Sequence, residues 1–333
     1  MITRRAFLKT TGAAGAIAFG AGPVRPVVAQ DQPETTRLTL ANTTSLCAAP
    51  QYIAEELLRG EGFDAVRHLR LPGGPEVYKV LSTGRADIAM AFTAPFLLHI
   101  DAEEPTVMLA GVHPGCFELF GNDRVRTIRD LKGKTVAVLG VGGMQHLFVS
   151  VMASYVGLDP RRDISFVTHT TADSMRLLGE GKIDAYLGFP PDPQEMRAKK
   201  IGHVVVNSAV DRPWSQYFCC IIAGNREFVR RHPMATKRAL RAILKSADVC
   251  ALEPARAART VVERGLAERY DHAFETIRGL PYAMWREYDP EDTVRFYALR
   301  LHEAGMVKSS PQKLITQGTD WRFLNELKKE LKG

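Results

Sequence analysis

The sequence predicts an α/β protein built as two lobes. From Arg37 onward, short β-rich runs alternate with helical stretches, which is typical of βαβ units and of mainly parallel sheets. A second series of such units begins after the charged stretch 122–134. About 300 residues are enough for two domains of the usual size. After Ala223 only helical patterns follow, so this tail has to pack on a sheet formed earlier in the chain.

The first series covers residues 38–112 and reads as strand and helix in alternation. Strands are expected at 38–41, 66–71, 87–92 and 106–112, and helices at 50–59 and 75–84. Each of these helices starts at a proline, which suits the first turn of a helix. Parallel strands joined by helices form right-handed units, so this series predicts one sheet with helices packed against it.

The second series covers residues 135–206 and repeats the pattern. Strands are expected at 135–139, 164–167, 184–189 and 203–206, and helices at 144–156, 172–179 and 194–199. Gly157 and Gly181 follow two of these helices, as glycines at helix C-termini do. The second series therefore predicts a second lobe with a sheet of its own.

One more strand is expected at 217–223, and helices follow at 233–252, 254–270, 290–304 and 320–331. The simplest topology has the chain leave lobe 1 near 115–120 and return near 214–220. Lobe 1 then comprises residues 37–116 and 220–333, and lobe 2 comprises residues 117–216. The helical tail packs on lobe 1, and the two crossings form a hinge. Ligands of open α/β sheets bind at the carboxyl ends of strands, so we expect a ligand between the lobes.

The first 29 residues predict a signal peptide of the twin-arginine (Tat) type. Arg4-Arg5 precede Phe7-Leu8-Lys9, an apolar run rich in glycine and alanine follows, and Ala29 is the expected cleavage site. A charged start, an apolar middle and a small residue at the cut are typical of secretory signals. The apolar run is too short to span a membrane, which takes about 20 residues. We therefore expect export by the Tat machinery to the periplasm.

Charge and cysteine spacing argue against several classes of function. Cleavage would remove Arg4, Arg5, Lys9 and Arg25 and no acid, which lowers the formal net charge from +7 to +3. The remaining basic residues are interspersed with acids, so we expect no nucleic-acid partner. The five cysteines have no metal-type spacing; we expect them to be buried thiols, with neither a metal nor another cofactor. They are Cys47, Cys116, Cys219, Cys220 and Cys250.

Several motifs together resemble the NMT1/THI5-like group of substrate-binding proteins, relatives of the nitrate, sulfonate and taurine receptors. These motifs are Gly73-Gly74-Pro75-Glu76, Leu81-Ser82-Thr83-Gly84-Arg85-Ala86-Asp87-Ile88-Ala89, Asp130-Leu131-Lys132-Gly133-Lys134-Thr135-Val136, Gly157-Leu158-Asp159-Pro160 and Gly181-Lys182-Ile183-Asp184-Ala185. The resemblance implies a type II periplasmic-binding-protein fold that closes around a small solute. It also implies an ABC transporter permease as partner; we expect a monomer.

The candidate solute-binding residues are those at strand ends, at a helix start and on the return crossing. Hydroxyls and free backbone amides after a strand can meet a ligand, and Gly73 and Gly74 allow close approach of the backbone. Gly143 opens a helix, and helix N-termini favour anions. The aromatic residues suit an aromatic or apolar solute body. The full set is Thr44, Ser45, Cys47, Gly73, Gly74, Phe92, Thr93, Gly143, Met144, Gln145, Thr171, Phe189, Pro190, Trp214, Gln216 and Tyr217.

Three enzymes are alternatives to a receptor. A yeast-type thiamin-pyrimidine synthase carries a cysteine-rich motif, of which Cys219-Cys220 is at most a fragment. A dinucleotide-binding fingerprint at 140–145 lacks its last glycine, because Gln145 stands there, and no acid ends the next strand. A desulfinase-like enzyme would use Cys47 as its reactive thiol, with Arg70 lowering the thiol pKa. His68 and Arg70 share one face of their expected strand, since side chains alternate along a strand. No other catalytic motif appears, so the sequence predicts a receptor and keeps the desulfinase-like enzyme as the alternative.

Overall fold

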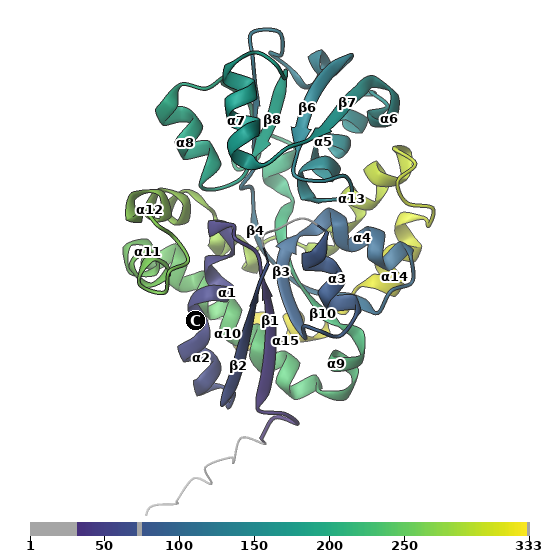
Figure 1. Cartoon of the computed structure of the whole chain (residues 1–333). Helices are drawn as coiled ribbons and strands as arrows, with labels where there is room; N and C mark the ends of the chain where they lie inside the picture. Colours follow the sequence, from purple (N-terminus) through teal and green to yellow (C-terminus); the bar gives the residue numbers. More distant parts are fainter. Residues whose placement is uncertain (1–31, 72–74, 332–333) are drawn as a thin grey trace, which may run out of the picture. The chain divides into compact units, whose positions relative to one another are not determined.

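The computed structural model describes residues 32–71 and 75–331. The expected signal peptide, residues 1–29, lies outside the described residues. Within the described part, residues from Pro33 onward form one compact unit that contains two five-stranded sheets (Figure 1). The prediction of an α/β protein with two lobes is therefore confirmed.

The first sheet has the strand order β2-β1-β3-β10-β4. Its strands are β1 (Arg37–Asn42), β2 (Ala65–Arg70), β3 (Ile88–Phe92), β4 (Thr106–Pro114) and β10 (Phe218–Asn225). β1 pairs in parallel with β2 and β3, whereas β10 runs antiparallel to β3 and β4. Every residue of β3, β4 and β10 is buried. Strands buried on both faces read as mainly apolar runs without alternation.

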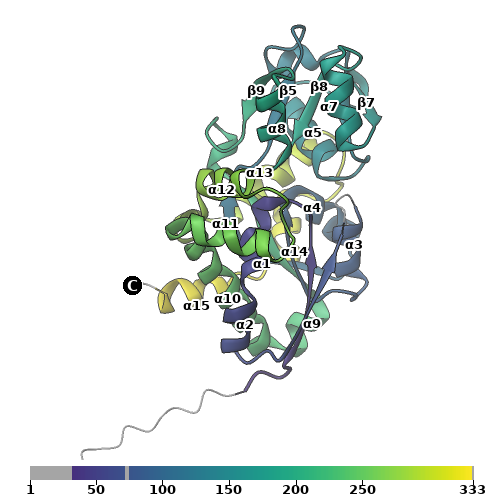
Figure 2. The ribbon, with the colours of Figure 1, turned by 60° about the vertical axis from the view of Figure 1, so that its left-hand side comes forward.

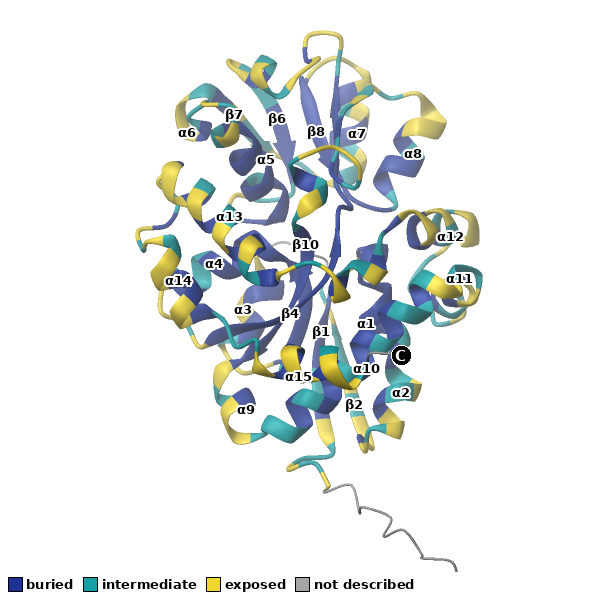
Figure 3. Ribbon diagram, turned by 180° about the vertical axis from the view of Figure 1, so that it is seen from behind, coloured by how far each residue is buried: buried dark blue, intermediate teal, exposed yellow. Residues whose placement is uncertain are grey.

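Helices lie on both sides of the first sheet (Figures 1, 2 and 3). On one side, α1 (Ala49–Ile53) and α2 (Glu55–Gly60) pack against α10 (Pro233–Leu252). On the other, α4 (Thr93–Asp101) packs against α3 (Glu76–Ser82) and α14 (Pro311–Gly318). The tail also contains α9 (Arg226–Arg231), α11 (Pro254–Glu263), α12 (Tyr270–Gly279), α13 (Pro290–Glu303) and α15 (Arg322–Glu330). Short 3-10 turns complete this lobe: η1 (Leu46–Ala48) and η4 (Tyr282–Arg286).

The second sheet has the strand order β7-β6-β8-β5-β9. Its strands are β5 (Glu118–Gly121), β6 (Lys134–Val138), β7 (Ile164–Thr168), β8 (Ala185–Gly188) and β9 (His203–Asn207). Around it lie η2 (Ile128–Leu131), α5 (Met144–Tyr155), α6 (Pro160–Asp163), α7 (Thr171–Gly179) and α8 (Asp192–Lys199). β6 is parallel to β7 and β8, and β5 is antiparallel to β8 and β9. In each sheet the reversed strand is the first one after a crossing of the chain.

The two crossings touch each other. The chain passes from β4 to β5 through Gly115, and it returns from β9 to β10 through Ala209 and η3 (Trp214–Gln216). Gly115 has a φ of +66°, and a Cβ atom placed on it would lie 2.3 Å from the Cα of Ala209. A side chain at Gly115 would therefore need both an unfavourable backbone conformation and space that the second crossing occupies.

Helix α13 contacts both lobes. The Tyr297 ring centroid lies 5.4 Å from that of Phe92 in β3 and 6.2 Å from that of Phe148 in α5. The Ser154 hydroxyl of α5 donates to the Arg300 carbonyl of α13 at 3.2 Å. The tail therefore packs on the first lobe, as predicted, and reaches the second lobe as well.

Some predicted elements differ from those observed. The helix expected at 50–59 is divided at Ala54 into α1 and α2. The helix expected at 254–270 ends at Glu263, because Gly265 takes a φ of +65° and turns the chain out of the helix. Strand β5 and helices α4, α6, α9, α12 and α14 were not predicted. Among the described residues, the longest and most apolar helices still fall short of what crossing a bilayer requires.

Candidate functional site

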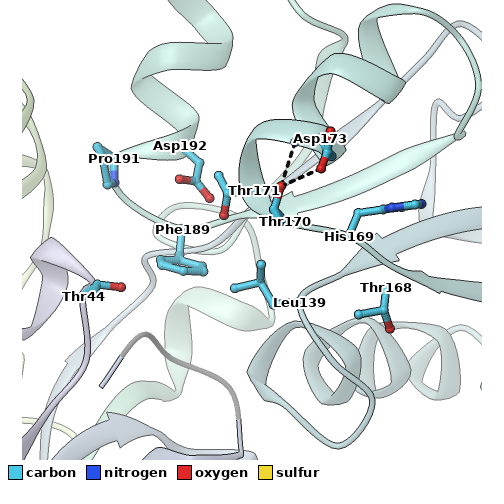
Figure 4. A pocket seen from close by; sticks show the side chains of 10 residues that line it. All are labelled: Thr44, Leu139, Thr168, His169, Thr170, Thr171, Asp173, Phe189, Pro191 and Asp192. Carbon is cyan, nitrogen blue, oxygen red and sulfur yellow. Dashed lines mark hydrogen bonds between the residues drawn. The ribbon is translucent and has the colours of Figure 1, made fainter. Parts of the chain in front are cut away.

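One cavity of about 630 Å³, called the main cavity below, takes its lining from both lobes (Figure 4). The first lobe contributes Thr44, from the loop after β1. The second lobe contributes the ends of β6, β7 and β8 and the starts of α7 and α8. Its lining residues there are Leu139, Thr168, His169, Thr170, Thr171, Asp173, Phe189, Pro191 and Asp192. The carboxyl ends of parallel strands meet at one edge of a sheet, so these segments come together although they are distant in sequence.

Hydroxyl groups dominate the polar lining of this main cavity. The Thr170 hydroxyl donates to the Asp173 carboxylate at 2.9 Å and accepts from the Asp173 backbone N–H at 3.2 Å, which caps α7. Arg176 hydrogen-bonds to Asp173 and holds the pKa of that carboxyl below its ordinary value. Thr44 and Thr168 add hydroxyls that can both donate and accept. The lining therefore suits a small polar molecule.

A buried hydrogen-bond network supports the floor of the main cavity. The Tyr186 hydroxyl donates to the Asp192 carboxylate at 2.7 Å and lies 3.4 Å from the Thr171 hydroxyl. The Gln145 amide donates to the Leu187 carbonyl at 2.7 Å and to the Tyr186 hydroxyl at 3.3 Å. Burial raises the pKa of Asp192 to about 6. Gln145 and Tyr186 thus position Asp192 and Thr171.

A second cavity of about 580 Å³ shares Thr44 and Pro191 with the main cavity. It adds residues of η1, of α8, of the loop between α11 and α12, and of the start of α12. They are Leu46, Glu195, Ala198, Lys199, Leu266, Ala267, Glu268, Arg269 and His272. The charged lining is mixed, because Lys199 and Arg269 stand beside Glu195 and Glu268. Both cations already have an acidic partner, Glu195 for Lys199 and Asp271 for Arg269.

Helix α8 also contacts the first lobe's tail directly. The Gln194 amide donates to the Thr276 hydroxyl of α12 at 3.0 Å, and this bond is buried. The Arg197 guanidinium donates to the Glu275 carboxylate of α12 at 3.0 Å. Nearby, the backbone N–H of Leu46 donates to the Pro190 carbonyl at 3.4 Å. The two lobes are thus joined by side-chain bonds beside the cavities.

A third cavity of about 410 Å³ lies beside β2 and contains the basic pair Arg70 and Arg264. Arg264 forms a 2.9 Å ion pair with Glu55, and Arg70 donates to the Arg264 carbonyl at 3.3 Å. His68 lies 2.9 Å from the Asn42 amide, and burial lowers its pKa. His68 and Arg70 do share this cavity, as their alternation on β2 predicted.

Cys47 has a different environment from the one that the desulfinase-like alternative requires. Its Sγ lies 3.1 Å from the Ser45 hydroxyl and 3.8 Å from Cys220 Sγ. Arg70 lines the third cavity, and Cys47 is not among the residues that line it. Hydrogen bonds from Cys116, Cys219 and Cys47 lower the pKa of Cys220 well below its ordinary value. The groups in contact with the Cys47 thiol are therefore a hydroxyl and another thiol, and not the Arg70 guanidinium that the alternative requires.

The structure brings three of the sixteen predicted solute-binding residues into the main cavity: Thr44, Thr171 and Phe189. Pro190 is next to Pro191 of the lining, and Ser45 and Cys47 follow Thr44 in the same loop. Gly73 and Gly74 lie outside the described residues. Direct contact of these residues with a solute stays a prediction.

The other predicted residues lie in the core or on the surface near the crossings. Phe92, Met144 and Trp214 are buried among apolar side chains, and the Thr93 hydroxyl donates to the carbonyls of Phe218 and Cys219. Gly143 caps α5, and Gln145 belongs to the network beneath the cavity. Gln216 is exposed, and Tyr217 stacks on Phe296 with ring centroids 4.0 Å apart. Phe92, Met144, Trp214 and Tyr217 thus pack against other side chains, and Thr93, Gly143 and Gln145 serve hydrogen bonding or helix capping.

Sequence reasoning missed the polar residues of α8 and of the α11–α12 loop. Asp192 follows two prolines after a predicted strand, which is a signal for a helix start beside a ligand site. The loop that contains Leu266 and Arg269 was not predicted, because one continuous helix was expected over 254–270. Gly265 was the signal that could have placed a loop there.

Two five-stranded α/β sheets, joined by two crossings and enclosing a cavity lined by both, define the class as the periplasmic-binding-protein fold. The sequence model of the NMT1-like family matches residues 31–266, which is more than half of the chain. The chain therefore belongs to the NMT1-like family, and the resemblance found in the sequence is confirmed. No curated protein matches the sequence.

Solved structures share the fold at low sequence identity. The periplasmic nitrate-binding protein NrtA from Synechocystis PCC 6803 is 17% identical, with a TM-score of 0.71 over 91% of this chain and 90% of that chain. The periplasmic aliphatic sulphonate-binding protein SsuA from Escherichia coli is 17% identical, with a TM-score of 0.66 over 86% and 94%. The desulfurization enzyme DszB is 15% identical, with a TM-score of 0.61 over 88% and 99%. The predicted fold is thus confirmed.

Proposed function

We propose that this protein is a periplasmic receptor that binds one small organic solute between its lobes and delivers it to an ABC importer. The observation that carries the proposal is the main cavity, whose lining joins Thr44 of one lobe to the strand ends of the other. A ligand that contacts both lobes favours the arrangement in which they approach, which is the basis of hinge closure. The similarity to NrtA and SsuA supports the transport role.

The cavities favour a small organic solute with hydrogen-bonding groups and an apolar part. The threonine hydroxyls of the main cavity can pair with its polar groups, and Phe189 and Leu139 can pack against an apolar or aromatic part. An anionic solute would meet Lys199 and Arg269 in the adjoining cavity, where its carboxylate or sulfonate would replace Glu195 or Asp271 as their partner. The solute class in this proposal is therefore a small organic molecule that is anionic, aromatic or both.

The proposal includes the organisation of the chain. Residues 1–29 direct export through the Tat machinery, and the mature protein acts as a monomer in the periplasm with an ABC permease as partner. Residues 37–116 and 220–333 form lobe 1, and residues 117–216 form lobe 2. The contact between the crossings at Gly115 and Ala209 supports these boundaries.

The test is to identify what the exported protein carries. Protein purified from the periplasm is denatured, and the released small molecules are identified by mass spectrometry and then titrated into ligand-free protein by calorimetry. We expect one solute per chain, recovered with unchanged mass after hours. Thr44→Val should weaken binding 5- to 30-fold, the effect of one hydrogen bond of about 1–2 kcal/mol. The exposed Thr83→Val is the control. No stoichiometric solute, or equal affinity in both variants, would contradict the proposal.

A cysteine-dependent enzyme is the second candidate, and the similarity to DszB favours it. Its reactive group would be Cys47, which lies in the loop that lines the cavity. Because serine is far less acidic than cysteine, Cys47→Ser would abolish turnover and leave binding largely intact. Wild-type protein that changes the mass of the identified solute, together with an inactive Cys47→Ser variant, would establish the enzyme. We expect intact solute with both proteins.

A further inference from the structure

Four of the five cysteines converge in the core from three separate segments. Cys47 lies in η1, Cys116 lies on the first crossing, and Cys219 and Cys220 follow Phe218 at the start of β10. Cys47 and Cys220 have their Sγ atoms 3.8 Å apart, and Cys116 and Cys219 have theirs 3.1 Å apart. All four are free thiols and at most 6% exposed. Free cysteines are often buried as single apolar side chains, but four in contact form a site that such packing does not explain.

His113 of β4 completes this cluster, and the partners of its Nδ1 decide which ring nitrogen is available to a metal ion. Its Nδ1 lies 3.0 Å from the Gly115 carbonyl and 3.2 Å from the Pro114 carbonyl. Carbonyl oxygens only accept, so Nδ1 carries the hydrogen and the lone pair of the neutral ring is on Nε2. Nε2 is fully buried and has no hydrogen-bond partner. A metal-binding histidine has this arrangement, with the other ring nitrogen donating to a carbonyl.

The His113 ring lies beside two of the thiols. His113 Nε2 or Nδ1, Cys47 Sγ and Cys220 Sγ offer ligand atoms that all lie within 4.8 Å of one another, and Nδ1 is already engaged. Bonds of about 2.3 Å from a tetrahedral ion to two sulfurs place those sulfurs about 3.8 Å apart. The Cys47–Cys220 separation of 3.8 Å equals this edge. The Cys116–Cys219 separation of 3.1 Å is too short for it, so these two thiols fit a supporting role beside Cys220.

Neighbouring groups hold the ligands in place. The Tyr282 hydroxyl donates to the Cys47 carbonyl at 3.0 Å, and the Ser45 hydroxyl lies 3.1 Å from Cys47 Sγ, where it can donate to a thiolate. Cys220 is fixed by the pairing of β10 with β3 and β4. The three candidate metal ligands therefore lie on the short turn η1 and on the adjacent strands β4 and β10, all of which pack in the core.

We propose that Cys47, Cys220 and His113 bind one thiophilic d10 metal ion, Zn²⁺ or Cu⁺, with a fourth coordination position left to another ligand. Thiolate and imidazole ligands select soft and borderline ions over Mg²⁺ or Ca²⁺. Three protein ligands and an open position are typical of zinc sites that act on a bound molecule. This site goes beyond solute binding and does not depend on it. The ligands are distant in sequence, which is why cysteine spacing alone does not reveal it.

The test is metal binding by the reduced, metal-free protein under anaerobic conditions. Co²⁺ serves as a spectroscopic probe, because tetrahedral Co²⁺ with thiolate ligands gives intense visible bands and sulfur-to-metal charge transfer. We expect one Co²⁺ per chain, displaced by one Zn²⁺, one Cu⁺ per chain in a separate titration, and no binding of Mg²⁺. Cys47→Ser, Cys220→Ser and His113→Gln should each weaken Zn²⁺ binding at least 100-fold. Cys250→Ser is the matched control, since Cys250 is equally buried in α10 but outside the cluster.

The outcomes separate this proposal from inert thiols and from a disulfide. Circular dichroism of the metal-free variants checks folding, and where His113→Gln fails to fold, the two serine variants carry the test. Absence of Co²⁺ charge-transfer bands in reduced wild-type protein would overturn the proposal, as would Zn²⁺ binding that Cys47→Ser and Cys220→Ser leave unchanged. Reduced protein that forms a Cys47–Cys220 disulfide in air but binds no metal would also overturn it. None of these results depends on whether the protein transports a solute.

Discussion

The Tyr186 hydroxyl donates a 2.7 Å hydrogen bond to the carboxylate of Asp192, and both side chains are buried where α8 begins at the main cavity. Burial raises the pKa of Asp192 from its ordinary 3.8 to about 6. Between these two values, the folded protein holds a proton that the unfolded chain has lost. The contribution of Asp192 protonation to the free energy of unfolding is therefore fully present below pH 4 and is lost as the pH rises through 6.

The first prediction uses this linkage. Asp192→Asn stays neutral and keeps an acceptor for Tyr186, so it should be more stable than wild type by about 3 kcal/mol at pH 8 and nearly equal at pH 4. Urea unfolding of both proteins at the two pH values measures the difference. Asp173→Asn is the control, because Asp173 has a lowered pKa and its contribution is constant from pH 5 to 8. A pH-independent difference between Asp192→Asn and wild type would contradict the shifted pKa.

The second prediction concerns the bond between Gln194 and Thr276, which joins α8 to α12. Thr276→Val keeps the shape and removes the hydroxyl, which leaves the Gln194 amide buried without its partner. We expect solute affinity to fall 5- to 30-fold, the equivalent of about 1–2 kcal/mol, although Thr276 does not line the cavities. Calorimetry measures the affinity, and small-angle scattering measures the accompanying loss of compaction on binding.

Thr236→Val is the matched control for that bond. Thr236 is buried and its hydroxyl donates to the His232 carbonyl within α10. The control should alter stability without altering solute affinity. Equal affinity for Thr276→Val and wild type would show that the α8–α12 contact has no part in closure.

The third prediction isolates the contact between the crossings. Gly115→Ala combines an unfavourable left-handed backbone with a clash against Ala209, and should cost about 3–5 kcal/mol of unfolding free energy. Gly142→Ala has a similar φ of +81° but open space at the Cβ position, so it should cost about 1–2 kcal/mol. Chemical unfolding of both variants gives the difference, which reports the contact alone. Equal losses would mean that the crossings are not packed together.

The fourth prediction concerns export. Replacing Arg4 and Arg5 together by lysine should leave the precursor in the cytoplasm, because the twin-arginine pair is the recognised address. Cell fractionation and immunoblotting measure the distribution. Arg25→Lys, a conservative change in the same segment, should be exported normally. Periplasmic accumulation of the double variant would exclude the twin-arginine route.

The order of strands and helices could be predicted from the sequence because strands and helices differ in the spacing of their apolar residues, and because prolines and glycines mark where elements begin and end. The 20-residue helix α10 was predicted with its observed bounds, since Pro233 and Pro254 mark its start and the start of the next helix. Helix α4 was missed because Thr93 and Ala94 continue a buried strand without a polar break. Pro95 in its first turn was the available signal.

The residues of the site were harder to predict from the sequence than the fold. Thr44, Thr171 and Phe189 were found because they stand directly at strand ends, where topology alone places them. Phe92 and Trp214 stand at similar points in the sequence, but their side chains fill the core. The direction of a single side chain at a strand end depends on tertiary packing. The thiol cluster could not be predicted for a related reason. Cys47 and Cys220 are 173 residues apart in the sequence, and they meet only in the folded protein.

Helix α13 attaches the two lobes at a place separate from the crossings and from the α8–α12 bonds. Crossings that touch at Gly115 and Ala209 provide an axis about which one lobe can rotate relative to the other. The contacts of Tyr297 and Arg300 with α5 lie outside the crossings and oppose such a rotation unless α13 slides along α5. We therefore expect substitutions in α13, more than a hundred residues after α5 in the sequence, to change how far the lobes move and how tightly a solute is held.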